Sequence, residues 1–170
     1  MLNITIHKTD APKEKPAKGT ALGFGNLFTD HMFLMDYSPD QGWHDARIVP
    51  YGPLTLDPAA SVLHYGQACF EGLKAYRGPD GKVRLFRPDC NGRRMMQSMR
   101  RMCMPEIPEE DFVQAIRALC RVEEAWVPDE IGSSLYFRPL AIATTPKLGV
   151  HASGNYLFCV LASPAGTYYP

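Results

Sequence analysis

The sequence predicts an α+β fold in which a mainly antiparallel sheet packs against a few helices. Three observations support this prediction: a β-hairpin signal at residues 72–86, two amphipathic helical patterns between residues 88 and 122, and strand-like apolar segments on both sides of this block. With 170 residues, of which 45% are apolar and 21% charged, the chain is suited to one domain with a packed core.

The first twenty residues are expected to form a mobile N-terminal arm, and residues 21–170 a small α+β domain. Residues 8–19 read KTDAPKEKPAKG, a run of lysine, proline and small residues that can bury little apolar area. Strands are predicted at residues 32–37 and 46–49, with a turn at residues 42–45 between them.

The hairpin signal at residues 72–86 has a physical basis. The turn Gly78-Pro79-Asp80-Gly81 separates two short strand patterns, because proline presets φ and glycine accepts a positive φ. Two helices are predicted next, one after Pro88 and one opened by Pro108. Residues at spacings of three and four form their expected buried stripes: Met95, Met96, Met99, Met102 and Cys103 in the first, and Phe112, Val113, Ile116, Leu119 and Cys120 in the second.

Two further strands are predicted at residues 134–142 and 156–162, the second continuously apolar and therefore buried on both faces. Successive side chains alternate along a strand, so Tyr136 and Arg138 are expected on one face of the first. A phenol beside a guanidinium could hold a carboxylate, but from the residues alone a solvated Tyr–Arg stack is equally consistent. Pro139 lacks an N–H group, so the strand is expected at a sheet edge or bulged there.

Composition argues against several classes of function. The 18 basic and 18 acidic residues cancel, which gives no basis for binding nucleic acid or an anionic membrane. The chain has neither an apolar run long enough to span a bilayer nor the apolar core of a signal peptide near its start. Its five cysteines include no CxxC pair, which indicates reduced thiols in a cytoplasmic protein. No metal site, Ser–His–Asp set, paired carboxylate site or Walker loop is expected.

Five segments in order resemble the branched-chain amino acid aminotransferases, which bind pyridoxal phosphate in the fold type IV manner. The segments are FGNLFTDHM at residues 24–32, LHYGQACFEGLKAYRGPDGKVRLFRP at 63–88, SSLYFRP at 133–139, TPKLGV at 145–150 and LASPAGTYYP at 161–170. Each segment alone would be a weak signal, and their shared order makes the resemblance specific. It implies the small N-terminal α+β domain of a fold type IV enzyme.

The resemblance also implies a function and a site. The enzyme would transfer amino groups between leucine, isoleucine or valine and 2-oxoglutarate, in amino-acid biosynthesis, as a homodimer. Arg94 matches the arginine that contacts the cofactor phosphate, and it lies near a predicted helix start, which itself favours an anion. Arg138 matches the residue that receives the distal carboxylate of glutamate. Other positions that match the pocket lining are Phe24, Tyr65, Phe70, Tyr136, Leu148, Val150 and Tyr168, with Leu148, Val150 and Tyr65 expected to close the partner's pocket.

In this family the lysine that forms the Schiff base lies in a C-terminal cofactor domain, beyond Pro170. The chain is therefore expected to hold no catalytic residue and to be inactive alone, although Lys74 lies inside FEGLKAYR. Two alternatives remain open. One is a sister fold type IV enzyme, either a D-amino acid aminotransferase or an aminodeoxychorismate lyase, although FTDHM and SLYFRP resemble the branched-chain group more closely. The other is a non-catalytic fragment that acts only in binding or dimerisation.

Overall fold

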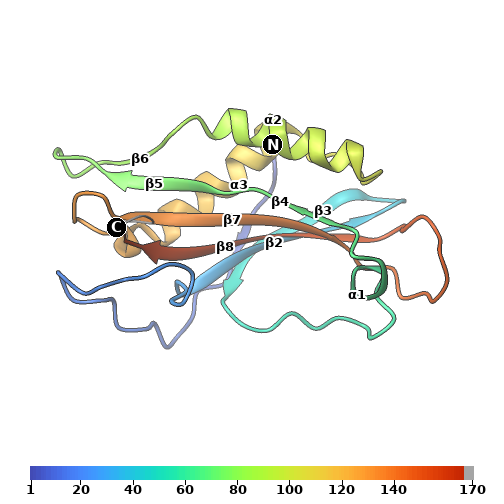
Figure 1. Ribbon diagram of the computed structural model, residues 1–170, viewed down its shortest axis with the longest axis horizontal. Coiled ribbons are helices and arrows are strands. Elements are labelled where there is room, and N and C mark those ends of the chain that lie inside the picture. Colours follow the sequence, from blue (N-terminus) through green and yellow to red (C-terminus); the bar gives the residue numbers. More distant parts are fainter. Residues whose placement is uncertain (167–170) are drawn as a thin grey trace.

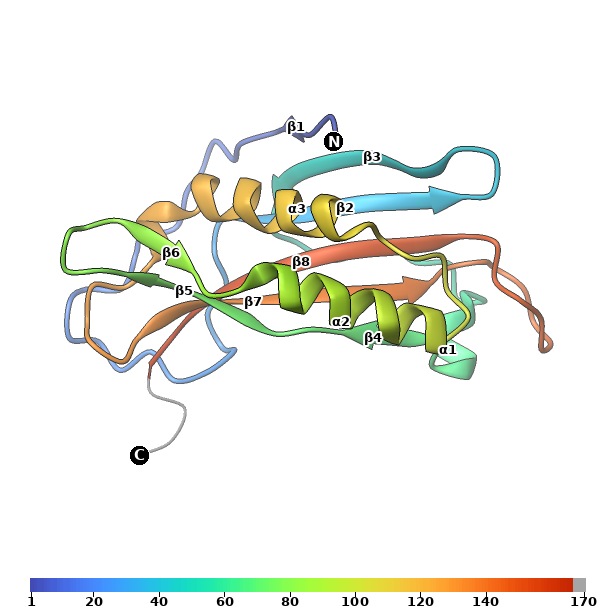
Figure 2. The same cartoon turned by 90° about the horizontal axis from the view of Figure 1, so that it is seen from above.

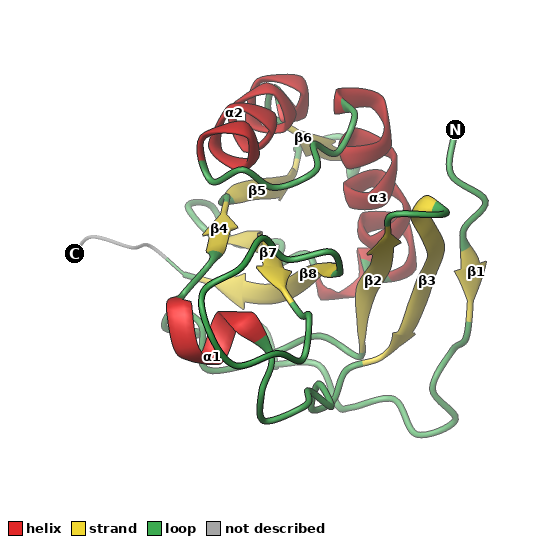
Figure 3. Cartoon of the chain, turned by 90° about the vertical axis from the view of Figure 1, so that its right-hand side faces the viewer, coloured by secondary structure: helices red, strands yellow, loops and turns green. Residues whose placement is uncertain are grey.

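The computed structural model describes residues 1–166. In this part of the chain one eight-stranded sheet carries two long helices on one face, which confirms the predicted α+β class (Figures 1 and 3). Its strand pairs are antiparallel except β1 with β3. In sheet order, the strands are β1 (Thr5–Ile6), β3 (Gly42–Pro50), β2 (His31–Ser38), β8 (Tyr156–Ala165), β7 (Ser134–Ala143), β5 (Leu73–Arg77) and β6 (Val83–Leu85), while β4 (Ala68–Phe70) pairs with β7.

The helices α2 (Pro88–Arg101) and α3 (Glu109–Val122) cover one face of the sheet, and α2 runs alongside β4 and β5 (Figure 2). The short α1 (Ser61–Tyr65) lies away from them, and a single 3₁₀ turn, η1 (Glu124–Trp126), follows α3. Both long helices begin where proline and acidic residues favour a helix start. The two predicted helices are therefore confirmed.

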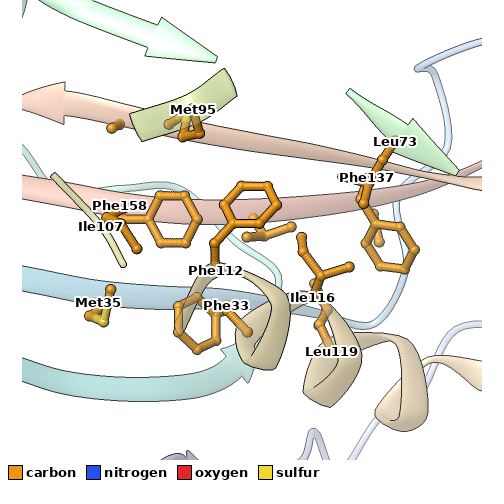
Figure 4. Close-up of a cluster of buried hydrophobic side chains, with 14 of the residues drawn as sticks. Phe33, Met35, Leu73, Met95, Ile107, Phe112, Ile116, Leu119, Phe137 and Phe158 are labelled. Atoms are coloured by element: carbon orange, nitrogen blue, oxygen red, sulfur yellow. The ribbon is translucent and has the colours of Figure 1, made fainter. Parts of the chain in front are cut away.

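The main core lies between the helices and the sheet. Figure 4 shows Phe112 and Ile116 of α3 directed towards Phe33, Phe137 and Phe158 of the strands, and all five side chains are fully buried. The ring centroids of Phe112 and Phe158 are 6.1 Å apart. Burial on this scale gives about 1.5–3 kcal/mol for each large apolar side chain, which is what holds the two helices on the sheet.

The apolar stripe of α2 is shorter than predicted. Met95 and Met99 are fully buried, but the helix ends at Arg101, and Cys103 lies beyond it, exposed, with φ +53°. Met104 N–H donates to Met99 O at 2.9 Å, and Cys103 N–H to Arg100 O at 3.1 Å. This is the usual way of closing a helix with a left-handed residue, but cysteine takes the position where glycine is normal. The helix end therefore had no signal in the sequence.

The predicted hairpin between β5 and β6 is confirmed. Gly78 N–H donates to Lys82 O at 2.9 Å, and Gly81 has the positive φ that such a turn requires. The turn predicted at residues 42–45 was wrong, because those residues belong to β3 and the turn lies at residues 39–41. Gly42, with φ +68°, begins the strand itself.

Pro139 lies in the interior of the sheet, and the predicted edge position was wrong. Its strand β7 pairs with β8 on one side and with β4 and β5 on the other. The pairs Phe70↔Leu140 and Leu73↔Phe137 share one register, so Glu71 lies opposite Pro139. Glu71 N–H donates to Pro139 O at 2.9 Å, but proline returns no bond. The lost ladder bond thus coincides with the interruption between β4 and β5.

The N-terminal arm is attached to the domain at several points, although its mobility stays a prediction. β1 pairs with β3, and Leu2 exchanges two 2.8 Å hydrogen bonds with the side chain of Gln114. Lys13 N–H donates to the Asp30 carboxylate at 2.8 Å, and the Lys15 ammonium ion-pairs with the same group at 3.1 Å.

A buried polar network connects this arm to the core. The side chains of His31 and Glu123 are 8% and 1% exposed, and His31 Nδ1 lies in close contact with Glu123 Oε1. Because His31 Nε2 accepts the Thr9 N–H at 2.9 Å, the imidazole proton lies on Nδ1 and is donated to Glu123. The second Glu123 oxygen accepts Asp30 N–H at 3.2 Å, and Trp126 Nε1 donates to the Asp30 carboxylate at 2.9 Å. Burial raises the pKa of Glu123 above its ordinary value.

Within residues 1–166, every helix is too short or too polar to cross a bilayer. The same residues contain no cluster of three or more His, Cys, Asp or Glu side chains that could hold a metal ion. All five cysteines lie in this part of the chain and carry free thiols.

Candidate functional site

The face of the sheet opposite α2 and α3 is only partly covered. Cross-strand partners project from the same face, so Arg138 shares this face with Leu161, and Tyr136 shares it with Lys74. Further along the sheet the face is closed by a second apolar cluster. Around Tyr136 and Arg138 it stays partly exposed, and Phe70 beside them is 61% exposed. This uncovered zone is the candidate site.

Aromatic rings surround the guanidinium of Arg138. Its Nε donates to Tyr136 Oη at 3.1 Å, and its Cζ lies 4.6 Å from the centroid of the Phe70 ring. The ring of Phe24 packs on Tyr136 with centroids 4.9 Å apart. The expectation that Tyr136 and Arg138 share a face is confirmed, and the structure brings Phe24 and Phe70 to the same place. Rings stacked against a guanidinium hold its plane while leaving its N–H edges accessible.

Gly72 allows this arrangement. A Cβ atom at this position would lie 2.4 Å from Tyr136 Oη, closer than any real contact. Only glycine therefore lets the phenol lie across the strand and reach Arg138.

The zone carries positive charge without a matching acid. Among the described residues, no carboxylate forms an ion pair with Arg138, whose polar contact is the Tyr136 hydroxyl. Lys74, directly opposite Tyr136 in β5, likewise has no acidic partner in the described part. A carboxylate from outside this part of the chain would find two cations beside apolar rings. Lys74 was not predicted for this face, because its position depends on the register between β5 and β7.

Arg94 lies on the other side of the same sheet edge. Its Nε and Nη2 donate to the two oxygens of Glu71 at 2.6 and 2.7 Å. Phe70 and Glu71 are consecutive and project to opposite faces, so they hold Arg138 and Arg94 on either side of one strand. An open hollow of about 410 Å³ lies beside this strand, lined by Gly72, Leu73, Lys74, Tyr76, Phe86, Asn91 and Tyr136.

Arg94 lies too far along α2 to gain affinity for an anion from the helix start, contrary to the expectation from the sequence. Arg94 is the seventh residue of α2, which begins at Pro88, whereas free N–H groups belong to the first turn. Any affinity of Arg94 for an anion therefore comes from its own guanidinium, which is 65% exposed.

The remaining predicted residues lie elsewhere. Tyr65 ends α1, and Leu148 and Val150 lie in the loop between β7 and β8, at the far end of β7 from Tyr136. Ser61 N–H donates to Thr145 O at 3.1 Å, so α1 and this loop form one unit. Leu148 and Val150 are 68% and 92% exposed, and within the described chain they do not reach Arg138. Tyr168 lies outside the described residues.

The chain is similar to known proteins over almost its whole length. No family model matches the chain. The branched-chain-amino-acid transaminase 1 of Bacillus subtilis is 57% identical over 166 residues, which are 98% of this chain and 46% of that protein. The branched-chain-amino-acid aminotransferase of Mycolicibacterium smegmatis is 52% identical over 172 residues, 99% of this chain and 47% of that protein. The chain belongs to the branched-chain aminotransferase family. It spans just under half the length of these curated relatives.

Solved structures of branched-chain aminotransferases share the fold. The enzyme of Escherichia coli aligns with a TM-score of 0.64 at 20% identity, over 83% of this chain and 41% of that one. The enzyme of Thermobaculum terrenum, solved in its PLP form, aligns with a TM-score of 0.56 at 24% identity, over 79% of this chain and 39% of that one. The expected family and the fold type IV architecture are thus confirmed.

Proposed function

We propose that this chain is the N-terminal, pocket-lining domain of a branched-chain amino acid transaminase, which exchanges amino groups between leucine, isoleucine or valine and 2-oxoglutarate. The observation that carries this proposal is the Arg138 guanidinium, set among aromatic rings with no carboxylate partner in the described chain. One pocket must accept both an apolar branch and a charged carboxylate. Phe24, Phe70 and Tyr136 supply an apolar wall, and Arg138 supplies a charge at its edge.

The geometry around Arg138 suits alternating substrates. Tyr136 Oη accepts the Nε–H, and no other described residue bonds to the guanidinium, so both Nη groups are available for a bidentate contact with the distal carboxylate of glutamate. When leucine binds instead, the Phe70 ring keeps the guanidinium in place over its face at 4.6 Å. The same wall then packs against the apolar branch, and the guanidinium stays solvated at the edge.

Pyridoxal phosphate is the proposed cofactor, and the donor chemistry of Arg94 fits its phosphate. Within the described chain, two of the five guanidinium N–H groups bond to Glu71, which leaves three for a ligand on a side chain that is 65% exposed. When bound, this cofactor serves as the electron sink that makes amino transfer feasible. This chain would hold the phosphate and line the pocket, while the reactive lysine would belong to the C-terminal domain of the full-length enzyme.

A direct assay tests the proposal. The full-length enzyme should convert leucine, isoleucine and valine with 2-oxoglutarate into glutamate and the corresponding 2-oxo acids. Turnover of D-amino acids, or release of pyruvate from aminodeoxychorismate, would instead identify a sister enzyme of the same fold. Absence of turnover with all of these substrates would leave a domain that only binds or dimerises.

Replacing Arg94 by alanine should raise the dissociation constant of pyridoxal phosphate by about ten- to a hundredfold, since a charge-assisted bond contributes about 1.5–3 kcal/mol. The preference among leucine, isoleucine and valine should stay unchanged. The measurement is cofactor dissociation at a fixed phosphate concentration. Arg93→Ala is the matched control, because Arg93 is 55% exposed on the same helix and pairs with Asp89. Equal dissociation constants for the two variants would remove Arg94 from the cofactor site.

The full-length enzyme should be a homodimer in which the loop carrying Leu148 and Val150 closes the partner's pocket. The double variant Leu148→Glu/Val150→Glu should shift the dimer towards monomer and lower activity in parallel, because it places charge on apolar side chains that are 68% and 92% exposed here. Sedimentation velocity measures the shift. Ile131→Glu changes an equally exposed apolar residue elsewhere and should leave the dimer intact. A fully active monomer would contradict the prediction.

A further inference from the structure

Glu71 is a buried carboxylate at the interruption between β4 and β5. Its side chain is 6% exposed, whereas the carboxylates that pair with Arg93 and Arg100 on the same helix are 45% and 31% exposed. Isolated burial of a carboxylate is costly, so such a group persists where its oxygens are matched by donors. Pro139 lies opposite Glu71 and accepts its N–H at 2.9 Å, but it donates no ladder bond in return.

Every donor around Glu71 converges on its two oxygens. Arg94 donates to both at 2.6 and 2.7 Å, Asn91 Nδ2 donates to Oε2 at 2.9 Å, and Gly72 N–H approaches Oε2 at 3.3 Å. Asn91 is itself held by Gly72 O at 3.1 Å. Burial alone would raise the pKa of Glu71, but the bonds from Arg94 and Asn91 outweigh it and keep the pKa below its usual range. Glu71 is therefore a fixed anion at neutral pH.

This anion determines which edge of Arg94 is available. A guanidinium has two edges that can bind an oxyanion through a pair of N–H groups: Nε with Nη2, and Nη1 with Nη2. Glu71 occupies the first edge completely. No described residue other than Glu71 bonds to the second edge, and the exposed Arg94 lines a hollow together with Ala68, Gln97, Ser98 and Arg101.

We propose that Glu71 is a positioning residue for the cofactor phosphate: it clamps the Nε–Nη2 edge of Arg94, so that the Nη1–Nη2 edge is presented to the phosphate in one orientation. This inference rests on the proposed function, because it assumes that pyridoxal phosphate binds beside Arg94. Glu71 also offsets part of the arginine charge, which weakens its attraction for phosphate. Without Glu71, the long and exposed Arg94 side chain would lose conformational entropy when the phosphate binds. Because Glu71 already holds it in place, this entropic cost is avoided, and the gain in affinity exceeds the loss from the reduced charge.

The test compares two ligands that differ only in the phosphate. In the full-length apoenzyme, Glu71→Gln should weaken the binding of pyridoxal phosphate by about tenfold, the equivalent of one hydrogen bond. It should leave the affinity for pyridoxal, which has no phosphate, unchanged. A purely structural role of Glu71 would weaken both ligands equally. Tighter binding of pyridoxal phosphate by the variant would mean that charge outweighs orientation, and would overturn the inference.

A double-mutant cycle shows whether Glu71 acts through Arg94. Arg94→Lys keeps the charge but removes the planar fork, so adding Glu71→Gln to it should cost little further affinity for pyridoxal phosphate. Additive losses would contradict the inference. If the unmodified enzyme binds pyridoxal phosphate no better than pyridoxal, the proposed cofactor site itself fails. If it discriminates strongly and Glu71→Gln discriminates equally well, only the role of Glu71 fails.

Discussion

Replacing Arg138 by methionine in the full-length enzyme should lower kcat/KM for glutamate and 2-oxoglutarate by about ten- to a few hundredfold, the kinetic equivalent of roughly 1.5–3 kcal/mol. Arg138 has no acidic partner among the described residues, so its charge is available to a substrate carboxylate. Methionine fills a similar volume but leaves that carboxylate unpaired in an aromatic setting. Leucine has no distal carboxylate, and its half-reaction, followed by single-turnover absorbance, should fall far less.

Two further variants test whether the effect is specific to the Arg138 guanidinium. Tyr136→Phe removes the hydroxyl that accepts the Arg138 Nε–H at 3.1 Å, so it should shift the glutamate-to-leucine ratio in the same direction by a smaller factor. Arg121→Met removes an exposed arginine on α3 and should change neither substrate. Discrimination between glutamate and leucine arises mainly from the free-energy cost of leaving the substrate carboxylate unpaired. The strength of the Arg138 contact itself contributes less. Equal losses for glutamate and leucine would show that Arg138 holds the α-carboxylate or the fold instead.

Replacing Glu123 by leucine should lower the free energy of unfolding by about 3–5 kcal/mol. Leucine has a similar size, but it accepts no hydrogen bond, so the His31 Nδ1–H and the Asp30 N–H lose their acceptors in a buried site. The loss should extend to the arm, because His31 also accepts the Thr9 N–H. Urea denaturation measures the change, and hydrogen exchange of the Thr9 amide reports the release of the arm.

Adjacent residues provide the controls for this prediction. Glu124 is 58% exposed and lies 3.8 Å from Arg77, so Glu124→Leu should change stability by less than about 1 kcal/mol. Glu123→Gln keeps the shape of the side chain but replaces one acceptor oxygen by an NH₂ group that faces another donor. Its loss of unfolding free energy should lie between those of Glu123→Leu and Glu124→Leu. Similar stabilities for Glu123→Leu and Glu124→Leu would mean that the buried network contributes nothing.

Local signals in the sequence located most elements of the fold. The hairpin around Gly78 and Gly81 and the helices after Pro88 and Pro108 follow from backbone preferences that act within a few residues. The strand period placed Tyr136 and Arg138 on one face for the same reason. One error arose where a residue adopts an unusual conformation for its type, as Cys103 does with φ +53° at the end of α2.

No local sequence pattern predicted which residues would pair across the sheet. Glu71 and Arg94 are separated by 22 intervening residues, and the residue opposite Glu71 in the sheet is Pro139, far along the chain. Lys74 joins the site face only through its register with Tyr136. The network of His31, Asp30 and Glu123 spans more than ninety residues of sequence. Each of these contacts depends on which strands become neighbours, which no local pattern specifies.

The sequence by itself determined the α+β class and the family, and it predicted residues for the candidate site, because these inferences depend on motifs, composition and short-range periodicity. The tertiary structure decided how the site is built. It set Arg138 among Phe70, Tyr136 and Phe24 and left it without an acid in the described chain. It also paired Arg94 with a buried Glu71. The physical reason is that hydrogen bonds and burial depend on which residues are close in space. In this sheet, strand register determines which residues are close, whatever their separation in the sequence.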